Sequence, residues 1–179
     1  MDCVCRYDSP LGGITIAGCN DALTGLWFDG QKHFAETLSP DHAAGFLPVF
    51  DEARRWLDLY FSGKDPGFTP PLELRGTAFR RTVWEVLLTV PYGRTTSYGR
   101  IAEAIAQQQK TGRVSARAVG NAVGHNPVSL IVPCHRVTGA DGSLTGYAGG
   151  MDRKNWLLRT EQTETPQGFS PSRVSFPVR

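Results

Sequence analysis

A proline- and glycine-rich stretch over residues 63–71 divides this chain into two parts with different hydrophobic periodicity. Before it, residues 3–29 alternate apolar and polar side chains in short runs separated by turn residues, which is typical of a small antiparallel sheet. After it, apolar residues recur at helical spacing. A fold that satisfies both patterns is of the α+β class. We therefore expect an amino-terminal sheet-and-helix domain over residues 1–70 and a mainly helical domain over residues 71–162.

One helix is expected in the first domain, and another closes the second. Apolar residues recur at helical spacing over residues 50–61, with Pro48 before them and Gly63 after them, so this helix can cover one face of the sheet. The closing helix is expected from residue 152 to about residue 161. Beyond it, residues 163–179 are polar and interrupted by prolines, which predicts a flexible tail.

The helical part contains three successive helices, each preceded by a hydroxyl side chain that can cap it. The second and third, joined by a polar turn, form a helix-turn-helix candidate. The third, residues 116–124, is made of small and apolar residues, with only Arg117 and Asn121 able to reach a base edge. Its slim surface fits the minor groove, about 6 Å wide, with little sequence discrimination. The alternative is a core helix with one exposed arginine. The candidate caps are Thr77, Thr96 or Ser97, and Ser115.

Composition and charge restrict the class of protein. The chain has 179 residues, is 40% hydrophobic, and has no apolar run near the roughly 18 residues that a membrane-spanning helix needs. No signal sequence precedes the first strand pattern, so we expect a cytoplasmic protein whose four cysteines are thiols. The net charge of +2 neither requires nor excludes nucleic acid. Five basic residues gather in one segment of the second part, which suits a surface facing phosphates. They are Arg94, Arg100, Lys110, Arg113 and Arg117.

The reactive groups of the chain lie in residues 126–137. An apolar run of strand type leads to Pro133, and a thiol, an imidazole and a guanidinium follow in Cys134, His135 and Arg136. Only the thiolate is a good nucleophile, and nearby cations lower the thiol pKa from roughly 8.5 toward neutrality. In an extended strand adjacent side chains point to opposite faces, so proton transfer from Cys134 to His135 needs a water molecule or a kink. The alternative is an inert cysteine at a strand end.

The segment Ile131 to Val137 resembles the active-site motif of the O6-alkylguanine-DNA alkyltransferases, which repair methylated guanine. The resemblance extends from residues 8–12 through residues 117–120 to Glu161, and it leaves only the tail uncovered. It implies a ribonuclease H-like amino-terminal domain and a winged helix-turn-helix carboxy-terminal domain. The implied activity is stoichiometric, irreversible transfer of an alkyl group from O6-alkylguanine to a cysteine, with O4-alkylthymine as a second candidate substrate.

The same resemblance implies the partner of the protein. It is double-stranded DNA, bound through the minor groove with the damaged base flipped out of the helix. No cofactor and no membrane are implied, and we expect a monomer.

Specific residues take roles through this resemblance. Cys134 is the alkyl acceptor, His135 its base acting through water, and Glu161 the carboxylate that orients the imidazole. Arg117 fills the gap left by the flipped base, and Tyr98 crowds the target phosphate and binds the base at N3. The other implied residues are Asn126 as the brace of the turn, Tyr147 as a wall of the pocket, the carbonyls of Cys134 and Val137 and the amide of Ala148 as contacts to the base, and Lys154 near the pocket.

A zinc site is known in the amino-terminal domain of some members of this family. Cys19 occupies one of its cysteine positions, and Cys3 or Cys5 stands near another, but the histidine positions are not matched. His33 and His42 do not complete the set, because a tetrahedral site needs four convergent ligands. We therefore expect no bound metal.

Three other functions compete with alkyl transfer. A cysteine peptidase uses Cys, His and Asn, but those residues normally converge from distant segments rather than standing side by side. A winged-helix transcription regulator leaves Cys134 unexplained. A non-enzymatic alkyltransferase-like protein that senses damaged guanine is the strongest alternative, but such proteins replace the cysteine that is present here as Cys134.

Overall fold

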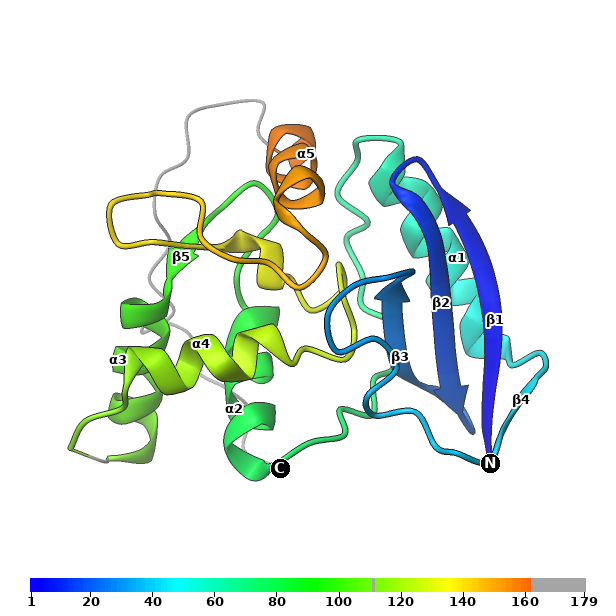
Figure 1. Cartoon of the computed structure of the whole chain (residues 1–179), viewed down its shortest axis with the longest axis horizontal. Coiled ribbons are helices and arrows are strands. Elements are labelled where there is room, and N and C mark those ends of the chain that lie inside the picture. Colours follow the sequence, from blue (N-terminus) through cyan, green and yellow to red (C-terminus); the bar gives the residue numbers. More distant parts are fainter. Residues whose placement is uncertain (111, 162–179) are drawn as a thin grey trace.

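The computed structural model describes residues 1–110 and 112–161, so the expected flexible tail, residues 163–179, lies outside the described residues. Figure 1 shows two parts side by side, a sheet backed by helix α1 and a group of helices around α4. This arrangement confirms the α+β class, whereas the division near residue 70 stays a prediction. Among the described residues, no helix has both the length and the apolar composition required to cross a bilayer.

The first part is an antiparallel meander with one added strand. Strands β1 (Asp2–Ser9), β2 (Gly12–Cys19) and β3 (Ala22–Phe28) pair as the alternation predicts, and α1 (Pro48–Phe61) packs on all three. Strand β4 (His42–Ala44) lies parallel to β1 at the sheet edge and was not predicted, because three residues are too few to show a period. The strand order is β3-β2-β1-β4.

The second part contains the predicted helices. Three of them are capped by a hydroxyl oxygen that accepts from a backbone amide, and those caps are Thr77, Ser97 and Ser115. The caps were predicted, with Ser97 rather than Thr96 preceding the second helix. Two short strands of the same part pair with each other in parallel. The elements are α2 (Ala78–Leu88), α3 (Tyr98–Gln109), α4 (Ala116–Gly124) and α5 (Met151–Glu161), with strands β5 (Thr96–Ser97) and β6 (Val137–Thr138).

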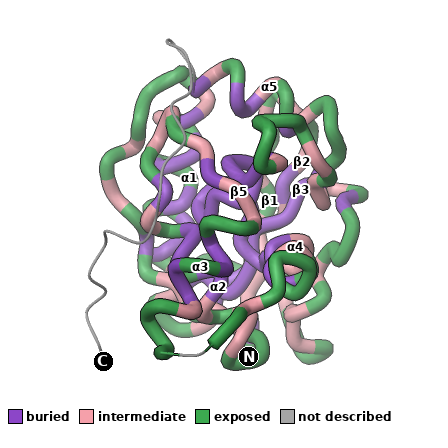
Figure 2. Tube along the Cα trace, turned by 90° about the vertical axis from the view of Figure 1, so that its left-hand side faces the viewer, coloured by how far each residue is buried: buried purple, intermediate pink, exposed green. Residues whose placement is uncertain are grey.

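One hydrophobic core runs through both parts, as the buried stretches at the centre of Figure 2 show. Trp84 is fully buried, and its indole nitrogen donates to the carbonyl of Ala122 at 2.8 Å, which fixes α2 against α4. The edge strand β3 joins the two parts through its backbone. The amide of Leu26 donates to the carbonyl of Pro127 at 2.9 Å, and that of Ser129 donates to Leu26 at 2.8 Å.

The predicted strand before Cys134 is wrong. Within residues 126–133 only Val128 pairs with a strand, and the rest of the run forms turns. Leu130 has a φ of 71°, in the left-handed region that an extended strand excludes. The apolar run is buried because the core surrounds it, and periodicity alone does not distinguish a buried turn from a buried strand.

The packing of β3 gives a test of the sheet. A Cβ on the buried Gly25 would overlap the ring of Trp27, which is 1% exposed and cannot leave without opening the core. We expect Gly25→Ala to lower the free energy of unfolding by about 1–3 kcal/mol, measured by urea denaturation. Gly112→Ala is the control, because a Cβ there has no neighbour within 4 Å. Equal losses in the two variants would contradict this packing.

Candidate active site

Cys134 lines a cavity of about 420 Å³ beside α4 and the glycine-rich loop, residues 145–150. The residue begins the short 3-10 helix η1 (Cys134–Arg136), and only 4% of its surface is exposed. Three other predicted site residues line the same cavity, namely Tyr98, Tyr147 and Ala148. The sulfur is therefore almost sealed by protein but stands at the edge of a space that a ligand can enter.

The pKa of the Cys134 thiol is raised, which corrects the expectation that neighbouring cations lower it. Burial has the largest effect, and the hydrogen bond from Asn126 and the charge of Lys154 offset it only in part. His135 and Arg136 are not free to act as cations toward the sulfur, because both side chains bind Glu161. The resting thiol is therefore protonated, and a thiolate has to be formed by proton transfer during a reaction.

Asn126 connects the turn to the sulfur. Its Nδ2 donates to the carbonyl of Val132 at 2.8 Å and to Cys134 Sγ at 3.1 Å. Its Oδ1 accepts from the amide of Val128 at 2.9 Å. All three contacts are buried, so the side chain fixes the turn and also offers the sulfur an N–H donor, which favours the thiolate over the thiol.

The carboxylate of Glu161, at the end of α5, collects donors from both parts of the molecule. Its Oε1 accepts from His135 Nε2 and from the hydroxyl of Tyr60, each at 2.6 Å. Its Oε2 accepts from Arg136 Nε at 2.8 Å and from the amide of Gly93 at 3.2 Å. Since Tyr60 belongs to α1 and the other donors to the helical part, this one carboxylate connects the sheet to the active site.

These contacts determine where the protons reside. Burial alone would raise the pKa of Glu161, but the hydrogen bonds from His135 and Arg136, together with the charge of Arg136, outweigh it and hold that pKa far below its usual range. An ionised carboxylate only accepts, so Nε2 of His135 carries a hydrogen. Burial lowers the pKa of His135, so the ring is neutral at neutral pH. Its Nδ1 is buried, has no hydrogen-bond partner among residues 1–110 and 112–161, and is left as a proton acceptor.

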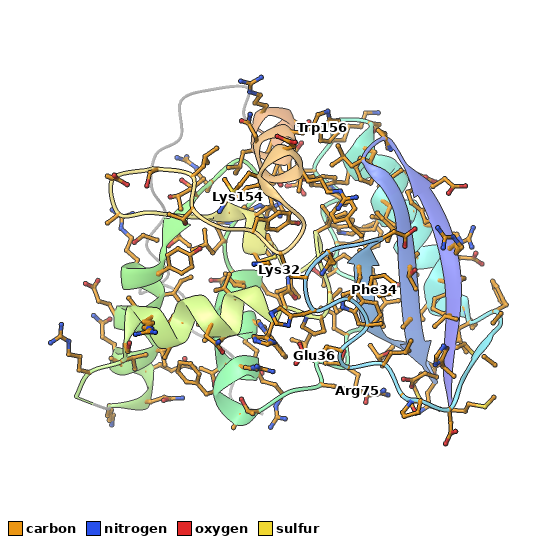
Figure 3. All side chains as sticks on the ribbon, in the orientation of Figure 1. Lys32, Phe34, Glu36, Arg75, Lys154 and Trp156 are labelled. Carbon is orange, nitrogen blue, oxygen red and sulfur yellow. The ribbon has the colours of Figure 1, made fainter. Side chains whose placement is uncertain are left out.

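Lys154, whose predicted role is the least specific, is fully buried on α5 next to the glycine-rich loop (Figure 3). Its ammonium donates to the carbonyl of Val137 at 2.6 Å and to that of Thr145 at 2.8 Å. Burial lowers the pKa of Lys154 to about 8. The carbonyl of Val137, expected to contact the base, thus already has one donor, and its second lone pair stays available.

The glycine-rich loop is also tied to the sheet by Arg153, which the sequence patterns did not indicate. Its guanidinium donates to the carbonyl of Gly149 at 3.1 Å and to that of Leu11 at 3.0 Å. The same group lies 4.6 Å from the centroid of the Phe28 ring. The loop that forms one wall of the cavity therefore takes its position from both parts of the chain.

The two predicted DNA-contact residues lie apart. Tyr98 begins α3, and its hydroxyl accepts from Thr145 Oγ1 at 3.2 Å at the cavity. Arg117 is exposed on the first turn of α4 and does not line that cavity. One side of α4 is buried through Val119, Ala122 and Val123, so both interpretations of this helix hold in part. The predicted residues that come together around the sulfur are Asn126, Cys134, His135, Tyr147, Lys154 and Glu161.

Tyr60 is the residue that sequence patterns missed. It was placed correctly on the apolar face of its helix, but a buried tyrosine brings a hydroxyl that needs a partner, and phenylalanine would fill the same space without one. That hydroxyl lies 2.6 Å from Glu161 Oε1 and 3.3 Å from His135 Nε2. The choice of tyrosine at a buried helical position was the available signal.

The cysteines considered for zinc are spread over the sheet. Cys3 and Cys5 lie on β1, Cys19 ends β2, and His42 is exposed on β4. In the part of the chain that the structure describes, these side chains do not converge as a ligand set.

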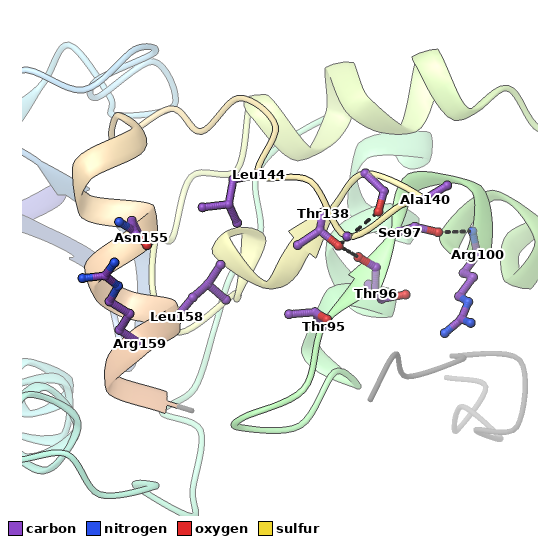
Figure 4. A pocket seen from close by; sticks show the side chains of 12 residues that line it. Thr95, Thr96, Ser97, Arg100, Thr138, Ala140, Leu144, Asn155, Leu158 and Arg159 are labelled. Carbon is purple, nitrogen blue, oxygen red and sulfur yellow. Dashed lines mark hydrogen bonds between the residues drawn. The ribbon is translucent and has the colours of Figure 1, made fainter. Parts of the chain in front are cut away.

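A second cavity, of about 490 Å³, lies between α5 and the paired strands β5 and β6 (Figure 4). Threonine, glycine and arginine residues line much of it, including Thr95, Thr138, Arg100 and Arg159, and it contains none of the predicted site residues. Of these two cavities, only the one beside α4 is lined by Cys134.

The fold and site define a two-domain α+β protein in which a helix-turn-helix borders a cavity holding one activatable cysteine. The chain belongs to the 6-O-methylguanine DNA methyltransferase family. The family's ribonuclease-like domain matches residues 6–74, and its DNA binding domain matches residues 78–163. The family resemblance and the fold expected from it are thereby confirmed.

The chain is similar to named relatives over nearly their whole length. The Methylated-DNA--protein-cysteine methyltransferase of Mycobacterium bovis is 46% identical over 161 residues, 89% of this chain and 92% of the relative. The protein of the same name from Methanosarcina acetivorans is 42% identical over 155 residues, 87% of this chain and 95% of the relative. The crystal structure of Mycobacterium tuberculosis OGT in complex with DNA has a TM-score of 0.78 at 45% identity, covering 92% of this chain and 95% of that one.

The depressed pKa of Glu161 predicts how stability depends on pH. A carboxylate whose pKa is lower in the folded than in the unfolded protein contributes stability above the unfolded pKa, about 4.3 for glutamate, and that stability is lost as the pH falls below it. We expect urea denaturation to show this loss in the unmodified protein. Glu161→Gln should be less stable at neutral pH by about 3–5 kcal/mol, since it leaves Arg136 buried without its charge partner. The free energy of unfolding of Glu161→Gln should also fall less steeply in acid than that of the unmodified protein. Parallel pH profiles of the two proteins would contradict the low pKa of Glu161.

Proposed function

We propose that this protein repairs DNA by moving an alkyl group from O6 of guanine to the sulfur of Cys134. The observation that carries this proposal is the cavity itself, where a buried thiol with an N–H donor on its sulfur lies next to a neutral imidazole held by a carboxylate. The two relatives described above are named methylated-DNA--protein-cysteine methyltransferases. Family membership and site chemistry support the same reaction.

The first step is formation of the thiolate. Nδ1 of His135 takes the proton of Cys134 through a bridging water, while Nε2 keeps its hydrogen bond to Glu161. The positive charge that appears on the imidazole is stabilised by the ionised carboxylate. Asn126 and the ammonium of Lys154 stabilise the negative charge on sulfur. These are positioning and charge effects, and no external cofactor is needed for them.

The second step is displacement at the alkyl carbon. The thiolate attacks that carbon in line with the bond to O6, so that a carbon–sulfur bond forms as the carbon–oxygen bond breaks. The electron pair of the broken bond leaves on guanine, and the hydroxyl of Tyr98 supplies a proton near N3. Because that hydroxyl accepts from Thr145 Oγ1, its own hydrogen is free to be donated. The proton held by His135 then restores Tyr98 through solvent.

The product explains why the protein acts once. A thioether has no carbonyl carbon for water to attack, unlike the thioester of an acyl-enzyme, so the alkyl group stays on Cys134. Transfer is therefore stoichiometric. The chain retains the cysteine, and this favours the repair activity over a damage sensor that binds alkylated guanine without accepting the group.

DNA binding follows from the surface next to the cavity. A base inside duplex DNA hides its O6 substituent, so the nucleotide has to rotate out of the stack at a cost of a few kcal/mol. The small residues of α4 allow a close approach to the minor groove, and Arg117 projects from its exposed first turn to fill the gap. The amide of Ala148, at the cavity wall, and the carbonyl of Val137 then contact the flipped base.

Intact mass spectrometry tests this proposal directly. After incubation with duplex DNA that contains O6-methylguanine, we expect one added methyl group per protein chain, located on the peptide with Cys134. Cys134→Ser should bind the same DNA without any mass gain. Retained DNA binding by the unmodified protein with no adduct would overturn the proposal and favour the damage sensor.

Arg117→Ala extends this experiment to base flipping. Its alkylation rate on duplex substrate should fall relative to its rate with free O6-benzylguanine, because a free base needs no extrusion from a stack. An equal duplex-to-free ratio in the variant and the parent protein would remove Arg117 from this role.

A further inference from the structure

Two histidines and a glutamate from different parts of the chain converge at the rim of the active-site cavity. His33 and Glu36 lie on the segment after β3, and His125 follows α4 directly before Asn126. Figure 3 shows Glu36 at the junction between the sheet part and the helical part. His33 and His125 also line the cavity that contains Cys134, so the cluster borders the site without belonging to its proton-transfer groups.

The donor atoms of this cluster are close to the spacing of metal ligands. Glu36 Oε2 lies 3.1 Å from His33 Nδ1 and 2.8 Å from His125 Nδ1, and all three ligand atoms lie within 4.8 Å of one another. Ligand atoms bound at about 2.0–2.2 Å around a tetrahedral ion are roughly 3.3–3.6 Å apart. Binding an ion therefore requires Glu36 Oε2 to move away from each of the two imidazole nitrogens by less than about 1 Å.

The charges of the cluster also favour a cation. The two imidazole rings are tilted by 35° with their centroids 3.7 Å apart, and neutral imidazole is the form that binds metal. Glu36 supplies a carboxylate oxygen, Oε2, that contacts both rings. Arg80 approaches only the other carboxylate oxygen, at 4.0 Å, and leaves Oε2 to the histidines.

We propose that His33, Glu36 and His125 bind one divalent transition-metal ion of the zinc class. Two imidazoles and a carboxylate are a donor set that suits zinc, cobalt and nickel rather than calcium or magnesium. The side chains of His33 and Glu36 are 40% and 43% exposed, so an ion reaches them from solvent and water completes its coordination.

The ion would link the segment after β3 to the end of α4. That segment already touches the glycine-rich loop, since the amide of Lys32 donates to the carbonyl of Ala148 at 3.0 Å. Metal binding thus fixes one side of the rim through which a base enters. A ligand that binds only the folded protein, at free concentration L, raises the free energy of unfolding by RT ln(1 + L/Kd), so the unfolding temperature rises with the metal concentration.

This set of ligands has no local sequence signature. His125 lies 89 residues after Glu36, and a single carboxylate completes the group. The proposed site shares His33 with the rejected zinc set and none of its cysteines.

Cobalt titration of the full-length protein tests the site. We expect one Co²⁺ per chain by native mass spectrometry, a visible absorption typical of nitrogen and oxygen ligands, and a rise in the unfolding temperature. Loss of a partner that only supports a metal ligand typically weakens binding roughly 10- to 100-fold. Glu36→Gln and His33→Asn should each weaken Co²⁺ and Zn²⁺ binding by at least that factor.

His42→Asn is the matched control, because His42 is an exposed histidine of the same domain that is absent from the cluster, and its metal affinity should not change. Unfolding curves of all variants without metal verify that each is folded. Three results would overturn the proposal. They are a thiolate-to-cobalt charge-transfer band, affinities unchanged in Glu36→Gln and His33→Asn, or no binding at millimolar metal. None of these three results depends on alkyl transfer, so they test the metal site independently of the repair activity.

Discussion

The active site depends on the buried carboxylate of Glu161. An ionised carboxylate in the interior is costly unless hydrogen bonds and opposite charges satisfy it. Here Tyr60 donates from the sheet part, while His135, Arg136 and the amide of Gly93 donate from the helical part. Satisfying one charge therefore requires both parts to be folded and in contact. The sheet domain, which carries no group of the proposed reaction, contributes to the site through this contact.

The state of the thiol follows from the same carboxylate. Because the ring of His135 is neutral and Arg136 binds Glu161, neither side chain acts as a cation on the sulfur, and burial keeps the pKa of Cys134 raised. A protein consumed by a single alkyl transfer benefits from a thiol that is protonated and only 4% exposed at rest, since stray electrophiles react mainly with thiolates. The buried Nδ1 of His135 is the proton acceptor through which the proposed reaction forms the thiolate.

Local chemistry made much of the fold predictable. The alternation of apolar and polar residues predicted the three-stranded meander. The hydroxyls of Thr77, Ser97 and Ser115 predicted where three helices begin. Family resemblance grouped the residues now found around Cys134. Long-range effects were not predictable in this way. The turns before the cysteine, the donor role of Tyr60 and the direction of the thiol pKa all depend on which segments surround a residue, and a local pattern does not contain that information.

The protonation of His135 is the central claim, and two-bond proton–nitrogen correlation spectra of ¹⁵N-histidine-labelled protein measure it directly. The signals of His135 are assigned by their absence from His135→Asn. At neutral pH we expect a neutral ring with its hydrogen on Nε2 and a bare Nδ1, the atom that accepts the thiol proton. An imidazolium, or a ring protonated on Nδ1, would leave Cys134 without an acceptor and contradict the account.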